Sequence, residues 1–447
     1  MTTRSPIAGA VGAAALAALL AGCGIFQKAG PKVTPTIGER RSVLGLEAQV
    51  EADASLAGVA VTLPPAELNT AWTQPGGSPS KSLGHLSLGG ALTPAFSVSI
   101  GQGASKFDRL GAAPVVAEGR IFTVDTTGTV SAFDAATGAR VWSAQPGTDS
   151  KNKYSLFGGG VSYDGGRVYA TNGVGAVSAL DAKTGAVAWT VRPGGPLRGA
   201  PTVADGNLYV MSQDSQIFSL KAADGTTQWS EAAPMEIAGV FGTGAPAFAQ
   251  GTVVAGFASG DLNAYRYENG RPLWNDALSR TSISTSVSSL SDIDAAPVID
   301  NGRVYAVGQG GRMVALELTT GQRLWELNIA GISTPWVAGE WIFVVTDDAR
   351  LLAIARATGK IRWISQLARF RDAEDKKGPI SWNGPVLAGG RLILTNSAGQ
   401  MASVNPVDGT LLSTTNLNRP VSLSPVVANN MLYILDDDGK LTAYRGA

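Results

Sequence analysis

The chain has 447 residues, of which 44% are apolar and 56 are glycine, so it is long enough and apolar enough to bury a large core. Its 35 basic and 35 acidic residues balance to a net charge of zero, which gives no reason to expect binding to nucleic acid or electrostatic attachment to a membrane surface. A single cysteine and a single histidine exclude a disulfide within the chain and a metal site of the cysteine/histidine type.

The N-terminus has the pattern of a bacterial lipoprotein signal. Arg4 supplies a positive charge, and Ile7–Leu20 form an apolar, alanine-rich segment that is too short to span a bilayer. The segment runs into Leu20-Ala-Gly-Cys23, which resembles a lipobox, where the signal peptide is removed before the cysteine and the cysteine receives lipid. We therefore predict a signal peptide over residues 1–22 and lipidation of Cys23. The alternative is an ordinary signal peptide followed by an unrelated cysteine.

The residues after the cysteine predict an anchor followed by a tether. Gly24 follows Cys23 instead of aspartate, which by analogy with Gram-negative sorting predicts that the lipid lies in the outer membrane. From Ile25 to Pro65, proline, glycine and charged residues are frequent and aromatic residues nearly vanish. This composition is typical of a flexible connection, so we predict a lipidated tether over residues 23–66.

The remaining chain, residues 67–447, is organised by a repeat. A turn ending in glycine follows a short apolar run, and a tryptophan stands four residues after the glycine, as in Asp181-Ala-Lys-Thr-Gly-Ala-Val-Ala-Trp189. The aspartate and the glycine are typical of a β-hairpin turn, and the tryptophan can wedge between neighbouring units. The tryptophans at this spacing are Trp142, Trp189, Trp229, Trp274, Trp325 and Trp363, and a seventh copy carries Ser413 instead.

A second recurring piece, which begins with Ala-Pro in four copies and with another residue before proline in three, occurs eight times between Ala113 and Ser424. Eight four-stranded units at this period predict a β-propeller or a β-solenoid. The last copy ends after its third strand, and a tryptophan strand at Leu68–Trp72 precedes the first copy. Since exchange of that strand closes a ring and removes exposed sheet edges, we predict an all-β, eight-bladed propeller closed by an N-terminal strand.

The signal, the tether and the eight repeats together resemble the BamB-type lipoproteins of the outer-membrane β-barrel assembly machinery, which share their repeat with the pyrroloquinoline quinone (PQQ) dehydrogenases. The resemblance implies a non-catalytic scaffold, anchored by lipid to the periplasmic face of the outer membrane. It further implies that the partner is the barrel-assembly protein (BamA-like), bound through its periplasmic POTRA modules. Nascent outer-membrane proteins are a second expected class of partner, bound by β-augmentation at blade edges.

Two loops carry the site residues that the resemblance implies. Asp292-Ile-Asp294 resembles the family's Asp-x-Asp loop, and Val240 and Phe241 lie where the family places its other contact loop, although the arginine found there in the family is lost. Asp292 and Asp294 stand two residues apart, so on an extended loop both are expected to face outward toward a basic partner surface. The alternative is that the pair caps the turn before Pro297.

The sequence argues against an enzyme. A quinone dehydrogenase of this architecture would resemble a propeller with a vicinal disulfide above its cofactor, and the chain has only Cys23. His85 is the only imidazole and has no adjacent nucleophile, and two aspartates without further oxygen ligands are weak evidence for a metal. We therefore expect no cofactor. The alternative function is a PQQ-like propeller lipoprotein with another binding role, toward cell wall or a small molecule, or a degenerate quinoprotein.

Overall fold

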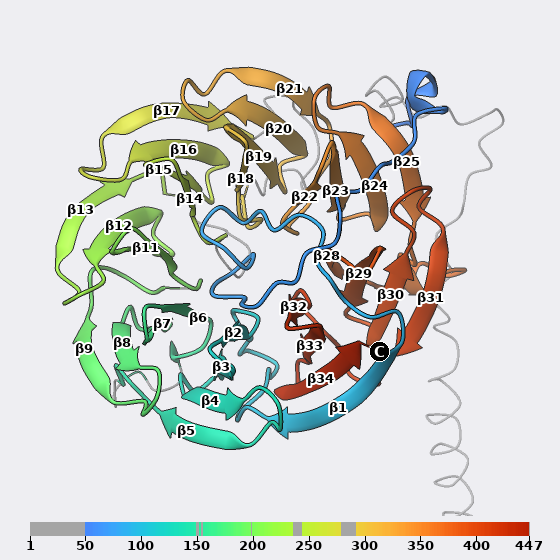
Figure 1. The fold of residues 1–447 in the computed structure, drawn as a ribbon. Coiled ribbons are helices and arrows are strands. Elements are labelled where there is room, and N and C mark those ends of the chain that lie inside the picture. Colours follow the sequence, from blue (N-terminus) through green and yellow to red (C-terminus); the bar gives the residue numbers. More distant parts are fainter. Residues whose placement is uncertain are drawn as a thin grey trace, which may run out of the picture. The chain divides into compact units, whose positions relative to one another are not determined.

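Each copy of the Ala-Pro repeat leads into the innermost strand of a four-stranded antiparallel sheet. The computed structural model describes residues 50–148, 152, 155–197, 199–235, 244–278 and 292–446. These residues form eight four-stranded sheets and one two-stranded sheet, and the eight sheets stand as blades around a central axis (Figure 1). The predicted eight-bladed β-propeller is therefore confirmed.

In the first seven blades the chain passes from the innermost strand outward, so the four strands pair in sequence order. Blade one contains β2 (Val115–Ala117), β3 (Arg120–Val124), β4 (Val130–Asp134) and β5 (Arg140–Ala144), and blade two contains β6 (Val161–Asp164), β7 (Arg167–Thr171), β8 (Val177–Asp181) and β9 (Val187–Val191). Blade three contains β10 (Thr202–Ala204), β11 (Asn207–Met211), β12 (Gln216–Lys221) and β13 (Thr227–Ala232), and blade four contains β14 (Ala247–Ala249), β15 (Thr252–Gly256), β16 (Asp261–Arg266) and β17 (Pro272–Ala277).

The second half of the ring follows the same order until the last blade. Blade five contains β18 (Val298–Asp300), β19 (Arg303–Gly308), β20 (Arg312–Glu317) and β21 (Arg323–Leu327), and blade six contains β22 (Trp336–Ala338), β23 (Trp341–Val345), β24 (Arg350–Ala355) and β25 (Ile361–Gln366). Blade seven contains β28 (Trp382–Ala388), β29 (Arg391–Asn396), β30 (Gln400–Val404) and β31 (Leu411–Asn416), and blade eight contains β32 (Val426–Ala428), β33 (Met431–Leu435), β34 (Lys440–Gly446) and β1 (Leu92–Ser99).

Six repeated tryptophans join blades one to seven in succession. The ring of Trp142 in blade one lies against Gly185 in the hairpin turn of blade two, where an added Cβ would be 2.6 Å from the ring. Its indole Nε1–H donates a hydrogen bond to the carbonyl of Ala182, 3.0 Å away. The same indole bond recurs between successive blades up to blade seven, from Trp189 to Ala222, Trp229 to Tyr267, Trp274 to Leu318, Trp325 to Arg356 and Trp363 to Pro406.

The N-terminal strand that closes blade eight is β1 and not the predicted Leu68–Trp72. β1 pairs antiparallel with β34, from Leu92 opposite Gly446 to Ser99 opposite Lys440. Phe96 of β1 takes the tryptophan position of this blade, because a Cβ on Gly138 of blade one would lie 2.4 Å from its ring. Blade eight has no hairpin turn between its third and fourth strands, since these come from opposite ends of the chain. Blade eight therefore offers no turn glycine for a tryptophan of blade seven to pack against, and blade seven has Ser413 at that position.

The predicted strand lies instead in the centre of the ring, within a segment that we call the channel segment, residues 69–86 (Figure 1). This segment hydrogen-bonds to every blade in spatial order, beginning at blade eight and ending at blade seven. The pairs are Asn69 with Val427, Trp72 with Val116, Thr73 with Tyr163, Gln74 with Val203, Pro79 with Phe248, Ser80 with Ile299, Gly84 with Trp336 and Leu86 with Leu387. All these partners except Trp336 hold the same position of the innermost strand. Their backbone groups would otherwise face the axis unpaired.

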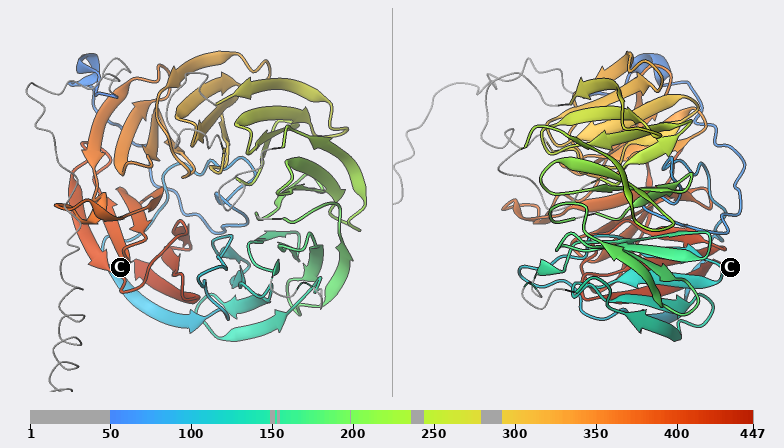
Figure 2. Two further views of the ribbon diagram at one scale, coloured as in Figure 1. Left: turned by 180° about the vertical axis from the view of Figure 1, so that it is seen from behind. Right: turned by 90° about the vertical axis from the view of Figure 1, so that its left-hand side faces the viewer.

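The residues before the channel segment lie against blade six. A 3₁₀ turn, η2 (Ala54–Leu56), follows Asp53, whose backbone N–H donates to the carbonyl of Ile361 on the outer strand. Arg362 donates to the carbonyl of Val59, and Val61 is buried. In the side view of Figure 2 this stretch crosses one face of the ring. Within the described ranges, no helix has the length and apolar character that a membrane span requires.

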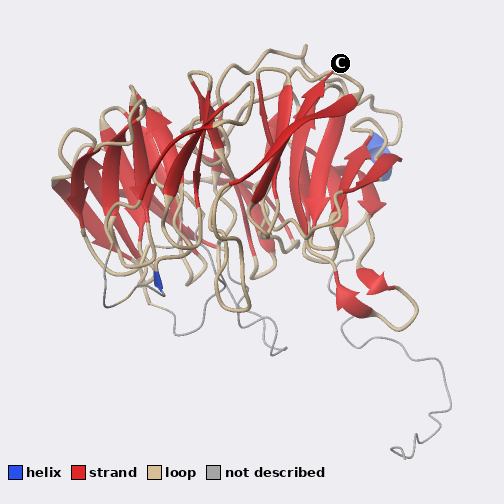
Figure 3. Ribbon diagram, turned by 90° about the horizontal axis from the view of Figure 1, so that it is seen from below, coloured by secondary structure: helices blue, strands red, loops and turns tan. Residues whose placement is uncertain are grey.

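A two-stranded hairpin projects from the opposite face. β26 (Phe370–Asp372) and β27 (Lys377–Pro379) pair antiparallel between blades six and seven. Figure 3 shows the hairpin standing clear of the ring. The two faces are therefore distinct, since one carries the incoming N-terminal stretch and the other carries this hairpin.

One buried charge is held in the channel segment. Lys81 is 2% exposed, and its Nζ donates to Thr202 Oγ1, 3.0 Å away. Burial lowers the pKa of this amine from 10.5 to about 7. No carboxylate forms an ion pair with it among the described residues. The folded protein therefore binds the Lys81 proton far less tightly than the unfolded chain does.

Gly185→Ala should destabilise the protein more than Gly206→Ala does. Both glycines have a φ of +75°, so both substitutions strain the backbone by about 1 kcal/mol or more. Only the Cβ at Gly185 meets the Trp142 ring, whereas nothing lies within 4 Å of a Cβ at Gly206. We expect Gly185→Ala to lose about 1–3 kcal/mol more of the free energy of unfolding, measured by urea denaturation. Equal losses would show that the tryptophan–glycine contact does not hold the blades together.

The free energy of unfolding should rise with pH between about 7 and about 10.5 because of Lys81. In that window the unfolded chain binds the proton and the folded protein does not, so raising the pH favours the folded state. Lys81→Met should remove this slope and raise stability at neutral pH. Urea midpoints of both proteins across the window test the prediction, and parallel pH profiles would contradict it.

Candidate partner-binding site

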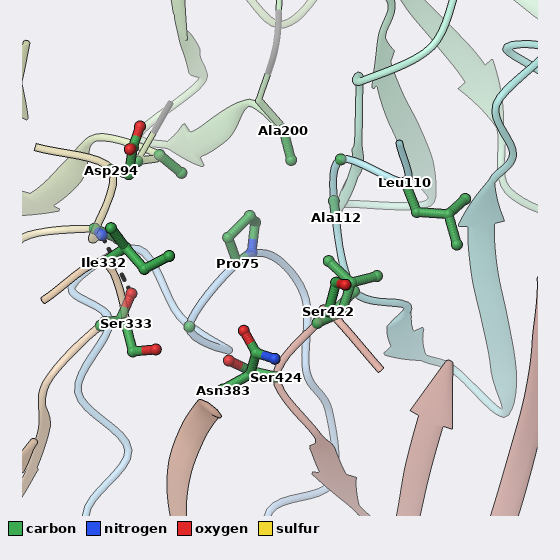
Figure 4. A pocket seen from close by; sticks show the side chains of 18 of the residues that line it. Pro75, Leu110, Ala112, Ala200, Asp294, Ile332, Ser333, Asn383, Ser422 and Ser424 are labelled. Atoms are coloured by element: carbon green, nitrogen blue, oxygen red, sulfur yellow. Dashed lines mark hydrogen bonds between the residues drawn. The ribbon is translucent and has the colours of Figure 1, made fainter. Parts of the chain in front are cut away.

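A cavity of about 450 Å³ lies at the mouth of the channel, on the face that carries the β26–β27 hairpin (Figure 4). We call this cavity the cup. Its floor is formed by the channel segment, at Trp72 and Gln74–Gly76. The floor is fixed, because the Gln74 side-chain amide donates to and accepts from the backbone of Val203, at 3.2 and 3.0 Å. Trp72 also stacks on Trp336, with ring centroids 6.2 Å apart.

The wall of the cup has two chemically different halves. Blades one, three, four and five contribute the alanine of each Ala-Pro pair, namely Ala113, Ala200, Ala245 and Ala296. Blades six to eight contribute hydroxyl and amide groups, namely Ser333, Thr334, Ser381, Asn383, Ser397, Ser422 and Ser424. The charged side chains among the described lining residues are those of Arg109 and Asp294.

Asp294 is the carboxylate of this wall, just before blade five. Its Oδ2 is buried and accepts no hydrogen bond, and no ion pair to either oxygen is found within the described part of the chain. Burial, together with the neighbouring carboxylates of Asp292 and Asp347, raises the pKa of Asp294 to about 7. A carboxylate oxygen that is buried without a donor is costly, so groups of this kind concentrate at functional sites.

The other aspartate of the pair does not face outward as predicted. Asp292 is only 2% exposed, and its backbone carbonyl accepts from the N–H of Gln309 in blade five. Ile293 donates to the carbonyl of Phe257 in blade four and fills the space beside Gly256, where an added Cβ would lie 2.4 Å from Ile293 Cγ2. The segment is thus wedged between two blades and is not a free extended loop. Only Asp294 of the pair lines the cup.

The remaining predicted site residues lie elsewhere. Val240, Phe241 and Cys23 fall outside the described residues. His85 has a structural place, because its Nδ1–H donates to the carbonyl of Pro64 at 2.8 Å and its Nε2 accepts from the N–H of Gly390 at 3.0 Å. The floor and the hydroxyl wall of the cup were missed from the sequence. The Pro75-Gly76-Gly77 string, which turns the chain directly after Trp72, was the available sign that this tryptophan does not belong to a blade.

The cup does not fit the quinone cofactor of the related dehydrogenases. PQQ carries several carboxylates, and the described lining offers one guanidinium, Arg109, together with the carboxylate of Asp294, which repels anions. The described residues also contain no group of three or more histidine, cysteine, aspartate or glutamate side chains placed to hold a metal ion.

Comparison with known proteins places the repeat in one family. The model of the family "Outer membrane protein assembly factor BamB" matches residues 101–156, 126–365 and 367–447. The chain is 30% identical to outer membrane protein assembly factor BamB of Escherichia coli (strain K12) over 392 residues, which cover 78% of this chain and 87% of that protein. It is 29% identical to outer membrane protein assembly factor BamB of Yersinia pestis over 329 residues, covering 72% and 81%.

Solved structures show the same fold at lower identity. BamB from Moraxella catarrhalis superposes with a TM-score of 0.68 at 21% identity and covers 79% of this chain and 100% of that chain. Quinohemoprotein alcohol dehydrogenase from Comamonas testosteroni superposes with a TM-score of 0.66 at 14% identity, covering 85% and 81%. These two likenesses establish the fold alone, since one propeller fold carries unrelated functions.

The eight blades, six of them carrying the repeated tryptophan, and the cup therefore define a propeller of the PQQ-like repeat class, without the charge pattern that the quinone requires. Within that class, the family model covers most of the propeller and the relatives agree with it. The chain belongs to the BamB family of outer membrane protein assembly factors. This family consists of assembly factors and not of enzymes.

Proposed function

We propose that this chain is a lipid-anchored scaffold on the periplasmic face of the outer membrane, where it holds the barrel-assembly protein through that protein's POTRA modules. The family match supports the part of the proposal that concerns outer membrane protein assembly. The lipobox at Cys23 supports the anchor. The propeller supplies a rigid platform, because each blade is joined to its neighbours and to the channel segment. The scaffold would therefore lose little conformational entropy when a partner binds.

The two faces of the ring support a division of roles. The chain arrives from its N-terminal side over the face that residues 50–66 cross. The opposite face carries the cup and the projecting β26–β27 hairpin. Asp294, which belongs to one predicted contact loop, and Gly244, three residues after Phe241 of the other, both line the cup. We therefore assign the partner to the cup face, away from the face that residues 50–66 cross.

Four residues are proposed to contact or support the partner. Asp294 presents a carboxylate at the cup wall, and Asp292 positions it, because the buried backbone at Asp292 is bonded to blade five. Val240 and Phe241 are proposed as apolar contacts of the same rim, on the grounds of their place in the sequence. A partial negative charge in a polar, concave site is complementary to a basic partner surface.

Asp294→Arg should weaken binding of the barrel-assembly partner, since it reverses the charge of the cup wall. We expect a loss of about tenfold or more in affinity, mainly in the association rate, with a further loss when Phe241→Glu is added. Binding of purified partner modules to immobilised protein measures both rates. Asp164→Arg is the matched control, because Asp164 is exposed at the other end of the innermost strand of blade two, as the last residue of β6.

Melting temperatures of the same variants separate binding from folding. If Asp294→Arg melted far below the wild-type protein but bound the partner normally while folded, Asp294 would be a structural residue. If Asp164→Arg weakened binding as much as Asp294→Arg, the partner would not be confined to the cup face.

Cys23→Ser should release the protein from the outer membrane without changing the propeller. Lipid chains contribute about 0.8 kcal/mol for each buried methylene, and the described residues offer no membrane-spanning helix as a second anchor. We expect the variant to fractionate as an unprocessed or soluble periplasmic protein in cells that lack the partner. Retention of the variant in the outer membrane of those cells would show that lipidation is not the anchor.

A further inference from the structure

From the cavity and its single carboxylate, we infer that the cup is a binding site for a protonated amine or guanidinium group, with Asp294 as the counter-ion. This chemistry has two sources, a small free amine or a basic side chain of the protein partner. The second source rests on the proposed function, whereas the first does not. The inference concerns an occupant of the cup itself and not the general charge of the rim.

The cup is preformed and blind, which is what a site for a small group requires. Its floor cannot open freely, because Trp72 forms an antiparallel bridge with Val116 and the Gln74 amide bonds both backbone groups of Val203. The volume of about 450 Å³ exceeds what one water molecule needs and suits a small organic group.

The carboxylate of Asp294 needs a donor that the described chain does not give it. The charged groups around it are Asp292 on its own segment and Asp347 from the β23–β24 turn of blade six, and both are acidic. Arg109 lines the cup but donates to the carbonyl of Ser105 at 2.7 Å, within its own loop. A cation in the cup would neutralise the Asp294 carboxylate, whose ionisation is now opposed by burial and by two like charges.

The rest of the lining fits an amine better than other cations or anions. An anion would be repelled by Asp294, and a divalent metal ion would require further carboxylates, of which the described residues place no suitable group. The alanines of blades three to five and the half-exposed Ile332 of the neighbouring blade six offer apolar surface to the carbon stem of the ligand. The serines of blades seven and eight offer acceptors to its remaining N–H groups.

The binding must depend on pH in a defined direction. Burial and the neighbouring aspartates raise the pKa of Asp294 to about 7, and only the ionised form attracts a cation. Affinity for an amine should therefore be full above about pH 8 and fall about tenfold for each pH unit below 7. A neutral alcohol of the same shape should show no such dependence.

Titration of the purified propeller chain with agmatine, which carries both a guanidinium and an ammonium group, tests the inference. We expect saturable binding by calorimetry at pH 8, at least tenfold weaker binding to Asp294→Asn, and unchanged binding to the exposed-site control Asp164→Asn. Asp294→Asn should remain folded, because it removes a carboxylate whose ionisation burial opposes. Melting curves of the variants check this point.

The source of the group is distinguished by adding the purified barrel-assembly partner. Displacement of agmatine by the partner would assign the cup to a basic side chain of that protein, and binding of both together would assign it to a free amine. No binding up to about 10 mM agmatine, or equal affinity for Asp294→Asn, would overturn the inference. In that event, partner binding that still depends on Asp294 would leave the proposed function intact.

Discussion

The structure depends on hydrogen bonds between the channel segment and the innermost strands of the blades. In a ring of sheets every innermost strand faces the axis with unpaired backbone groups, which are costly to bury without partners. Residues 69–86 supply those partners to seven of the blades in order, and bind blade six through the indole N–H of Trp336. The tryptophan–glycine contacts join neighbouring blades from outside, and the channel segment joins all of them from within. The N-terminal part of the domain therefore stabilises the ring in two ways: the channel segment binds the innermost strands, and β1 completes blade eight.

The same segment produces the functional asymmetry of the ring. By crossing the axis it gives the channel mouth on the hairpin face a fixed floor, and this mouth is the cup. Because the blades are sequence repeats with different residues before each innermost strand, the cup wall is apolar on one side and rich in hydroxyl groups on the other. Asp294 stands in this wall because Ile293 is wedged beside Gly256, which fixes the direction of the segment. The site thus follows from packing between blades four and five.

The architecture could be predicted from the repeat, whereas the features that depart from the repeat could not. The constant glycine-to-tryptophan spacing predicted the hairpins, and the eight copies of the second piece predicted the number of blades. The missing fourth strand of the last copy predicted closure by an N-terminal strand. The closing strand was misassigned because Trp72 matches the repeat better than Phe96 does, although Phe96 occupies the tryptophan position in β1. The outward direction predicted for Asp292 was wrong because alternation applies to a free extended segment, and this one is held by Gln309 and Phe257. The serines of the cup come from three blades and are far apart in the sequence, so the sequence did not predict that they line one cavity.

The most direct test of this account asks which face of the ring the barrel-assembly partner touches in the membrane. The chain has one natural cysteine, Cys23, predicted to carry lipid, so a cysteine introduced elsewhere can be labelled selectively with a thiol-reactive photocross-linker. Ser424→Cys places the probe on the exposed wall of the cup, and Glu340→Cys places it at the other mouth of the channel. The account predicts cross-links to the partner several-fold stronger from Ser424→Cys. Equal cross-linking, or stronger cross-linking from Glu340→Cys, would contradict it.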